Sequence, residues 1–557
     1  MLRGSLLSLL ILVHGLTFSS ALGAAELPPL GERATAWASA LGHGAVATAE
    51  KRAGHWRFAL AGQPFAAGHA PVAPQDVLFE IGSITKVFTG ILLGHAVLEG
   101  KLGLDDTLAQ RLPVAFGYAA TGAVTLKQLA THASCLPRLP DNLMHPGSDD
   151  PYAQYDQKAL FEYLATAKLD GQPPCRPEYS NLGFGILGVV LERAYGKPWA
   201  ALIREKVAGP LGMTDTVQEL SPAQQARFAE PWDGDQHAHP WSFQAIAGAG
   251  ALRSSLADMS KFADALLAGP KGPLAAVWPL LAGDFADMPA EGGKIGLALI
   301  HSKAGGEESY LHDGGTGGYR SLIQVHPASG RAVIVLASNA AATPPVWVAA
   351  WEAEGRPRAT RAEVALPGET LDEYVGVYNI DKSLRFTLVR RGDGLVARLT
   401  GQAFLPIFAS AKDELFYKAV DAQLSFGRDA AGKVESLTLH QNGRDLMASR
   451  EPGQVPHFEF PNGPALAEYA GEYDFGQTEP GVTIKVRAVP DLLLVQLTGR
   501  PEFPVFCTAK DRFEYDVLVA ALTFERDPAG KIVAVVLHQN GRDMRAPRLG
   551  AGSTAGP

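Results

Sequence analysis

Alternating apolar and polar residues recur in short segments along the chain, and this period-2 pattern is typical of β-strands with one buried face. Near the N-terminal end, the segment GAVATAEKRAGHWRFALAGQP (44–64) predicts a β-hairpin whose turn lies near Gly54. A longer apolar stretch begins at Ser83 and runs to about Gly100, which predicts a helix. The first part of the chain therefore combines strands with helices.

After residue 363 the pattern changes to strands alone. Four segments with period-2 apolarity are punctuated by glycine turns: RFTLVRR (385–391), LVARLTG (395–401), LSFGRD (424–429) and VESLTLHQNG (434–443). Several short strands with no helical run predict a small antiparallel barrel, closed so that no strand edge is left open.

This strand-rich part is repeated. LDEYVGVY from Leu371 recurs as LAEYAGEY from Leu466, and LHQNGRD from Leu439 recurs from Leu537. The offset grows from 95 to 98 residues, so the second copy carries an insertion near Gln477–Gly481. We expect a duplication that formed two barrel domains, residues 364–455 and 456–557. The repeated HQNGRD is interpreted as a hairpin turn rather than as a catalytic motif.

The first 25 residues have a different pattern. Arg3 is followed by an apolar run from Leu6 to Phe18 and then by small residues up to Ala25. This order is that of a secretory signal peptide, with cleavage after Gly23 or Ala25. An uncleaved anchor is the alternative, but the run is shorter than the roughly 20 apolar residues of a membrane span. The sequence thus predicts a periplasmic or secreted protein without a stable membrane span.

Charge and composition narrow the function. The 557 residues carry 58 acidic and 49 basic side chains, a net charge of −9, and no basic tract, which argues against a nucleic-acid partner. Three cysteines are too few for a disulfide scaffold or a four-cysteine zinc site, and we expect neither a metal nor a cofactor. The length fits three or four domains.

Ser83 and Lys86 open the apolar helical stretch, three residues apart on one face. A buried lysine has a lowered pKa, and a neutral amine beside a hydroxyl is a general base beside a nucleophile. Ser83 as a plain helix cap is the alternative, since a single Ser-x-x-Lys pair is weak evidence.

Two further polar motifs follow in order. Tyr179 and Asn181 lie between a proline-rich loop and the next apolar helix, where a phenol serves proton transfer and an amide holds lysine and substrate. His312, Gly314 and Gly315 lie on a glycine-rich strand edge, where a substrate backbone can approach closely and an N–H can stabilise an oxyanion.

Together FEIGSITKVFTG, YSNLGFGILG and HDGGTGG resemble the serine β-lactamase-related hydrolases, over about Ala45 to Asn339. This family includes class C β-lactamases, D-Ala-D-Ala carboxypeptidases, D-aminopeptidases and esterases. The resemblance implies an α/β fold for residues 26–363: a mainly antiparallel sheet flanked by helices, with an all-α lobe. Two small antiparallel β-barrels follow this domain.

The resemblance also implies roles for the motif residues. Ser83 would be the acylated nucleophile and Lys86 its proton acceptor. Tyr179 would be the general base and acid, and Asn181 would bind lysine and substrate. The N–H groups of Ser83 and Gly315 would form the oxyanion hole.

One departure concerns the third motif. His312 stands where class C β-lactamases usually carry lysine, and an imidazole is only partly charged near neutral pH. Its hold on a substrate carboxylate should therefore be weak and pH-dependent, which favours a peptidase or esterase over an efficient β-lactamase.

A second departure concerns cysteine. Relatives typically carry glycine at the position of Cys135, and Cys175 is not part of the usual motif. Two cysteines in neighbouring loops of an exported protein suggest a disulfide, whereas two separate buried thiols are the alternative. Cys507 has no counterpart in the first repeat and is expected to be an apolar filler.

We therefore expect an exported, metal-free serine hydrolase acting on amide or ester bonds of D-amino-acid peptides. The alternatives are a β-lactamase, a short-chain carboxylesterase, and a penicillin-binding or assembly module that does not turn over. The expected partner is a small peptide, β-lactam or ester substrate, with homo-oligomer formation through the barrels left open.

Overall fold

The computed structural model describes most of the chain, namely residues 27–143, 149–288, 293–302, 307–344, 347–348, 351, 361–380, 384–418, 422–441, 444–453, 455–476, 482–489, 492–498, 502–539 and 541–549. The chain divides into two compact units, one within Ala25–Glu354 and the other beginning at Gly355. The predicted signal peptide and the predicted insertion at 477–481 lie outside the described residues.

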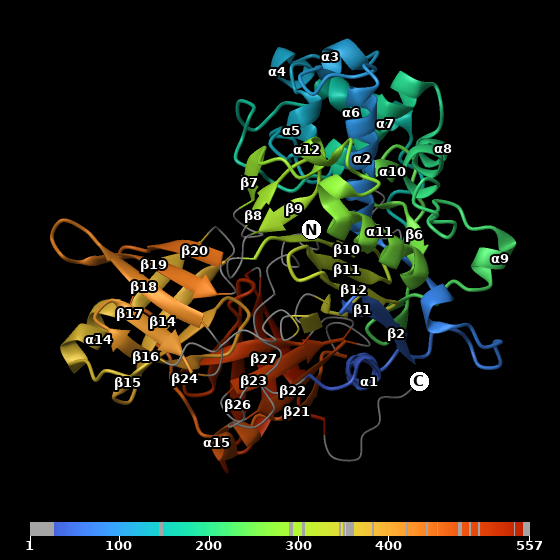
Figure 1. Ribbon diagram of the computed structural model, residues 1–557. Helices are drawn as coiled ribbons and strands as arrows, with labels where there is room; N and C mark the ends of the chain where they lie inside the picture. The colour runs from blue at the N-terminus through green and yellow to red at the C-terminus, as the bar shows by residue number, and fades with distance from the viewer. Residues whose placement is uncertain are drawn as a thin grey trace. The chain divides into compact units, whose positions relative to one another are not determined.

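An eight-stranded antiparallel sheet forms the centre of the first unit, in the order β2-β1-β12-β11-β10-β9-β8-β7 (Figure 1). The hairpin predicted at 44–64 is its β1–β2 pair. The strands are β1 Ala45–Arg52, β2 His55–Gly62, β7 Ala286–Met288, β8 Gly293–Ile295, β9 Ile300–Ser302, β10 Ser309–Gly315, β11 Arg320–His326 and β12 Arg331–Ala337.

Strand β12 is apolar on both faces because both faces of the sheet are covered. Val333 and Val335 belong to one buried cluster, whereas Ala332 and Ile334 belong to another. Side chains alternate between the faces of a strand, so a continuous apolar run is what a doubly covered strand requires.

Helices cover this sheet and build a separate helical lobe (Figure 1). Helix α1 contacts β1 and β2 and packs in the buried cluster that includes Val333 and Val335. Helix α11 contacts β11 and β12 and packs in the cluster that includes Ala332 and Ile334. The helices of the unit are α1 Leu30–Leu41, α2 Thr85–Leu98, α3 Leu108–Arg111, α4 Ala119–Gly122, α5 Leu126–Ala130, α6 Gln157–Thr166, α7 Asn181–Tyr195, α8 Trp199–Ile203, α9 Pro222–Gln225, α10 Ala247–Gly250, α11 Leu256–Ala268 and α12 Trp278–Leu281. Two small sheets pair β3 Leu78–Glu80 with β6 Arg253–Ser255 and β4 Trp232–Asp233 with β5 Gln236–His237.

The second unit begins with a closed eight-stranded barrel. Helix α14 (Gly368–Tyr374) precedes it, and Tyr378 pairs with Arg450 to join the last strand to the first. Its strands are β13 Gly376–Asn379, β14 Arg385–Arg391, β15 Gly394–Leu399, β16 Leu405–Ala411, β17 Glu414–Tyr417, β18 Ala422–Arg428, β19 Val434–Gln441 and β20 Arg444–Arg450.

A second eight-stranded antiparallel sheet follows helix α15 (Gly463–Ala467) in the same strand order. Its first and last strands are joined less completely, by one bridge between Tyr473 and Arg548. Its strands are β21 Gly471–Asp474, β22 Thr483–Val489, β23 Leu492–Leu497, β24 Phe503–Ala509, β25 Arg512–Glu514, β26 Ala520–Arg526, β27 Ile532–Gln539 and β28 Arg542–Pro547.

Matching polar contacts occur at corresponding positions of the two sheets. In the barrel, the Tyr374 hydroxyl donates to Asp413 at 3.0 Å, and Arg428 binds the same carboxylate at 2.7 Å. The corresponding contacts in the second sheet are those of Tyr469, Asp511 and Arg526. Each sheet is therefore stabilised by its own copy of an equivalent cluster of tyrosine, aspartate and arginine.

The HQNGRD motif forms cross-strand contacts on the outside of both sheets. His440 lies 2.6 Å from Asp445 and 2.7 Å from the Ser425 hydroxyl, and His538 lies 2.7 Å from Asp543. The Asn442-Gly443 turn between β19 and β20 lies outside the described residues.

A buried ion pair joins the barrel to the second sheet. Arg398 pairs with Asp516, which also accepts the Gly401 N–H at 3.0 Å, and the guanidinium lies 3.9 Å from the Phe506 ring centre. Both charged side chains are almost fully buried. Removing one partner of such a pair leaves an uncompensated buried charge, so this contact links the two repeats.

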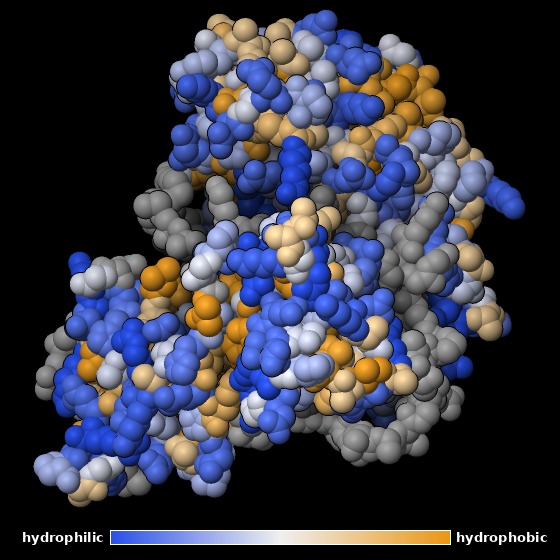
Figure 2. Space-filling view, turned by 90° about the vertical axis from the view of Figure 1, so that its left-hand side faces the viewer, coloured by the Kyte–Doolittle hydropathy of each residue, from blue (hydrophilic) through white to orange (hydrophobic). Residues whose placement is uncertain are grey.

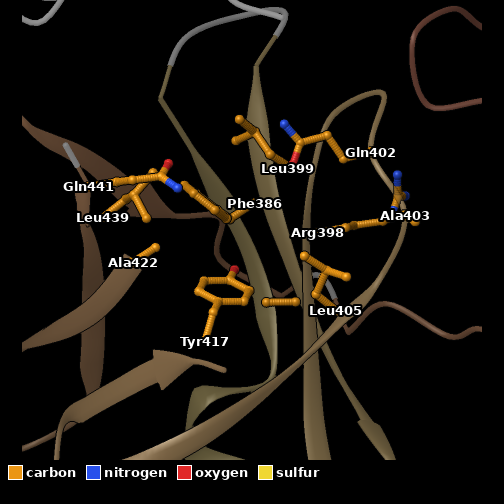
Figure 3. Close-up of a pocket in the computed structure, with 11 residues that line it drawn as sticks. Phe386, Arg398, Leu399, Gln402, Ala403, Leu405, Tyr417, Ala422, Leu439 and Gln441 are labelled. Carbon is orange, nitrogen blue, oxygen red and sulfur yellow. The ribbon is translucent and has the colours of Figure 1, made fainter. Parts of the chain in front are cut away.

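Figure 3 shows a pocket inside the first barrel, with the Tyr417 hydroxyl pointing toward Phe386. It contains none of the predicted catalytic residues.

On the face shown in Figure 2, hydrophilic residues cover most of the surface and hydrophobic residues form separate patches. No helix among the described residues is long and apolar enough to cross a membrane.

Candidate active site

Ser83 lies in a 3₁₀ turn, Gly82–Ile84, directly before helix α2. The sequence left its role open between helix cap and nucleophile. The N-cap position of α2 is occupied by Ile84, and no side chain caps the helix. The Ser83 Oγ instead lies 3.0 Å from Lys86 Nζ, so its hydroxyl is not used for capping.

Strand β10 passes very close to this turn. Gly82 has φ of +48°, and a Cβ there would lie 2.6 Å from the Gly315 nitrogen. A Cβ on Gly314 would lie 2.8 Å from the Ser83 nitrogen. Only glycine permits these approaches. They bring the backbone of β10 directly against the Ser83 turn, and an oxyanion hole made of the Ser83 and Gly315 N–H groups would need such a close approach.

The Lys86 amine is completely buried and has three polar contacts. Its Nζ lies 3.0 Å from Ser83 Oγ, 2.9 Å from Asn181 Oδ1 and 2.7 Å from the Ala249 carbonyl oxygen. The amide and carbonyl oxygens can only accept hydrogen bonds. A neutral amine therefore donates its two hydrogens to them and turns its lone pair toward the Ser83 hydroxyl.

Burial favours that neutral form. Desolvation lowers the pKa of Lys86 well below its ordinary value, and the positive charge of Arg138 lowers it further. Asp313 opposes the shift with its negative charge.

Asn181 is held at the first turn of α7. Ser180 caps this helix by accepting the Gly183 N–H at 3.0 Å, which fixes the direction in which Asn181 leaves the backbone. The Asn181 side-chain nitrogen lies 3.5 Å from the Tyr152 hydroxyl, at the limit of a hydrogen bond. The amide therefore lies between lysine and tyrosine.

Backbone hydrogen bonds hold the chain on both sides of Tyr179. The Glu178 N–H donates to the His132 carbonyl at 2.9 Å, and the Asn181 N–H donates to the Arg138 carbonyl at 3.0 Å. The loop that carries Tyr179 is thus joined to the loop after α5. This positions the tyrosine backbone independently of side-chain rotamers.

Three side chains lie near the Tyr179 ring. The His132 ring stacks on it with centroids 4.5 Å apart, the Lys86 Nζ lies 4.8 Å from its centre, and the Arg138 Cζ lies 5.1 Å away. The structure thus brings Ser83, Lys86 and Tyr179 into one cluster, as their proposed roles require.

His132 supports Tyr179 as a neutral ring. Its Nδ1 accepts the Ser180 N–H at 3.0 Å, so the ring proton lies on Nε2. Burial, and then the charge of Lys86, lower the pKa of His132 well below its ordinary value. The sequence indicated only a structural loop residue here.

Cys135 and Cys175 form a disulfide between the same two loops. The Cys175 N–H also donates to the Ala133 carbonyl at 2.9 Å. Cys135 has φ of +60°, in the left-handed region that favours glycine, which fits the glycine expected at this position in relatives. Cys507 is a buried free thiol.

His312 lies in β10 and is 2% exposed. Its Nδ1 lies 2.6 Å from the Asp313 carbonyl oxygen and donates to it. Burial, followed by the charge of Lys86, lowers the pKa of His312 to about 4. The expectation of a partly charged imidazole is therefore wrong, because desolvation keeps the ring neutral throughout the neutral pH range.

Asp313 and Arg320 complete the strand edge. Burial raises the pKa of Asp313, opposed by its own backbone N–H and by the charge of Arg320. The Arg320 guanidinium donates to the carbonyls of Thr316 and Tyr319 at 3.1 and 3.0 Å.

Among the described residues, no three His, Cys, Asp or Glu side chains gather as a metal site.

Sequence reasoning missed three groups of this cluster: the Ala249 carbonyl, Tyr152 and Arg138. A backbone oxygen has no residue type to recognise, but the run AGAG around Ala249 is a signal for close packing. A Cβ on Gly248 would lie 2.5 Å from the Phe184 carbonyl oxygen. Nothing in the motifs indicated Tyr152 or Arg138.

Two family models match the chain. The model described as Beta-lactamase matches residues 35–354, which is more than half of the 557 residues. A model described as Domain of unknown function (DUF3471) matches residues 360–450 and so covers the first barrel. Both matches agree with the change from the first unit to the barrel.

Similar proteins carry several names. The D-alanyl-D-alanine-carboxypeptidase/endopeptidase AmpH of Escherichia coli (strain K12) is 33% identical over 202 residues, 34% of this chain and 49% of that protein. Penicillin-binding protein 4* of Bacillus subtilis (strain 168) is 26% identical over 67% of this chain and 87% of its own length. Esterase EstB of Burkholderia gladioli is 33% identical over 29% of this chain and 43% of its own length. The chain spans about half the length of the E. coli relative.

The disulfide makes a testable contribution to stability. It closes a loop with a sequence separation of 40, so the Cys135→Ser, Cys175→Ser double variant should lose about 4 kcal/mol at most in the chain-entropy model. Thermal unfolding should show a lower Tm. A reductant should lower the wild-type Tm to that of the double variant and leave the variant unchanged, because Cys507 forms no disulfide. Equal Tm values without reductant would contradict the prediction.

Proposed function

The chain belongs to the beta-lactamase family of serine hydrolases, and we propose that its Ser83 forms an acyl-enzyme with amide or ester bonds of D-amino-acid peptides. The observation that carries the proposal is the 3.0 Å contact between Lys86 Nζ and Ser83 Oγ. Both other contacts of that amine are with obligate acceptors, so the neutral amine would turn its lone pair toward the nucleophile.

Acylation begins with proton transfer. As Ser83 Oγ attacks the carbonyl carbon, its proton passes to Lys86 Nζ and a C–O bond forms. The carbonyl π electrons move to oxygen, and the N–H groups of Ser83 and Gly315 stabilise the oxyanion. Because the amine is buried, it takes up this proton only transiently.

Expulsion of the leaving group needs a second proton. Tyr179 gives its hydroxyl proton to the leaving nitrogen or oxygen as the bond to the carbonyl carbon breaks, and Lys86 returns its proton to Tyr179. In deacylation a water molecule forms a bond to the acyl carbon as its proton passes to the same pair. The bond between the acyl carbon and Ser83 Oγ then breaks, Oγ regains that proton, and the acyl group leaves as a carboxylic acid. Asn181 would hold both Lys86 and the acyl amide of the substrate.

Names of the relatives support a peptidase but do not exclude its rivals. They comprise a carboxypeptidase/endopeptidase, penicillin-binding proteins, β-lactamases and an esterase. The neutral His312 favours a peptidase or esterase over a β-lactamase, because no cation stands at that position to hold a β-lactam carboxylate. We assign the matched C-terminal sheets to a duplication.

Hydrolysis should depend on Ser83. The panel is a labelled penicillin, a D-alanyl-D-alanine peptide and p-nitrophenyl acetate, each incubated with wild type and with Ser83→Ala. We expect Ser83→Ala to lower turnover of every substrate by about a thousandfold or more. Ser221→Ala is the matched control, because Ser221 caps the short helix α9 at an exposed position.

Each result of this panel separates the alternatives. Turnover that survives Ser83→Ala would refute the mechanism. A stable penicillin adduct without turnover would favour a peptidase or a non-turnover module over a β-lactamase, and activity on the ester alone would favour an esterase.

The pH dependence should report the lowered pKa of Lys86. Because the neutral amine is the active form, kcat/KM rises as pH rises through that pKa and is constant above it. The plateau should be reached well below pH 10, whereas a lysine of ordinary pKa would give a rise up to about pH 10. The measurement is p-nitrophenyl acetate hydrolysis from pH 5 to 10, corrected with Ser83→Ala. A rise that continues to pH 10 would contradict the prediction.

Export is part of the proposal, supported by the signal-like N-terminal sequence and by a disulfide, which persists in oxidising compartments. Amino-terminal sequencing of protein recovered from the periplasm or the medium should begin just after Gly23 or Ala25. A chain that keeps Met1 and remains with the cytoplasmic fraction would contradict export.

A further inference from the structure

Burial disfavours the charged form of three basic groups of the candidate active site. Lys86 and His132 are completely or almost completely buried, and desolvation lowers the pKa of each well below its ordinary value. His312 has a pKa of about 4 for the same reason. Arg320 is also largely buried, and its Nη1 donates to two backbone carbonyls. An exposed cation is better placed than these buried groups to receive a substrate anion from solvent.

Arg138 supplies such a cation. Its side chain is exposed, and its Cζ lies 5.1 Å from the centre of the Tyr179 ring. The backbone is held in place, because the Arg138 carbonyl accepts the N–H groups of Asn181 and Leu182 at 3.0 and 3.2 Å. The residue is thus attached to the start of α7 and cannot drift away from the catalytic cluster.

No carboxylate of the described residues lies within 4.0 Å of the Arg138 guanidinium. A guanidinium that lies over an aromatic ring keeps its in-plane N–H groups available for a carboxylate. Arg138 therefore combines a fixed position with unused donors.

The charge of Arg138 acts on the interior of the site. Burial is the main cause of the raised pKa of Tyr152, and the Arg138 charge opposes it. Burial also lowers the pKa of Lys86, and here the Arg138 charge adds to the effect. Its field thus reaches the groups that contact the nucleophile.

We propose that Arg138 binds a carboxylate on the leaving group of the substrate. This inference rests on the proposed function, in which Tyr179 protonates the leaving group, so a cation beside the Tyr179 ring lies on the leaving-group side. Such a site selects peptides with a free C-terminal carboxylate directly after the cleaved bond, as in a carboxypeptidase.

Two acetate esters test the proposal, because they share the acyl group and differ in leaving-group charge: 3-acetoxybenzoate and 3-acetoxybenzamide. We expect wild type to favour the benzoate in kcat/KM. Arg138→Gln should lower the benzoate-to-benzamide ratio by about tenfold or more, as expected for a lost hydrogen bond to a charged group. Arg138→Lys should retain part of the ratio, since lysine keeps the charge but not the planar fork.

Arg204→Gln is the matched control: this exposed arginine loses the same charge and should leave the ratio unchanged. Added salt should weaken the wild-type preference by screening. A wild-type ratio near one, or an equal fall for both esters in Arg138→Gln, would overturn the proposal, the latter showing that Arg138 only supports Tyr179.

Binding without turnover separates this proposal from the proposed function. Calorimetric titration of both esters into Ser83→Ala measures affinity alone. A benzoate preference there that disappears in Ser83→Ala, Arg138→Gln supports the carboxylate site even if turnover is absent. Turnover by Ser83→Ala would refute the nucleophile and leave the binding result standing, and equal affinities for both esters would refute the carboxylate site.

Discussion

The buried amine of Lys86 is the constraint on which the rest of the first unit depends. An ammonium ion without water is costly, so the site needs an amine that is neutral and fully hydrogen-bonded. Its polar partners come from the adjoining turn before α2, from α7 and from α10, at separations of 3, 95 and 163 residues. The fold must therefore bring two remote segments to the lysine before a single proton can be transferred.

The glycines of β10 and the two loops around Tyr179 serve the same geometry. Gly82 and Gly314 remove the side chains that would keep the Ser83 and Gly315 amides apart. On the other side, backbone hydrogen bonds and the disulfide join the loops that carry Cys135 and Cys175. Both devices act on the backbone, so nucleophile and tyrosine are positioned by the fold and not by flexible side chains.

Desolvation also determines the charge pattern of the site. It lowers the pKa of Lys86, His132 and His312, so each carries positive charge less readily than it would in water. The guanidinium of Arg138, by contrast, is exposed and lies beside the Tyr179 ring. A site of this kind combines an internal base that is available in its neutral form with an external anion site, which is why chemistry and substrate preference can be tested separately.

The sequence by itself determined the features that have local periodicity or a fixed spacing. The hairpin at 44–64, the helix after Ser83 and the repeated strand pattern could be predicted, because neighbouring residues suffice to specify them. The cysteine pair could be predicted because both cysteines fall in loops of a chain with a signal-like N-terminus. The incomplete joining of the second sheet, the Ala249 carbonyl, the position of Arg138 and the neutrality of His312 could not. Only the tertiary structure decided these, because burial and contacts between remote segments do not exist until the chain has folded.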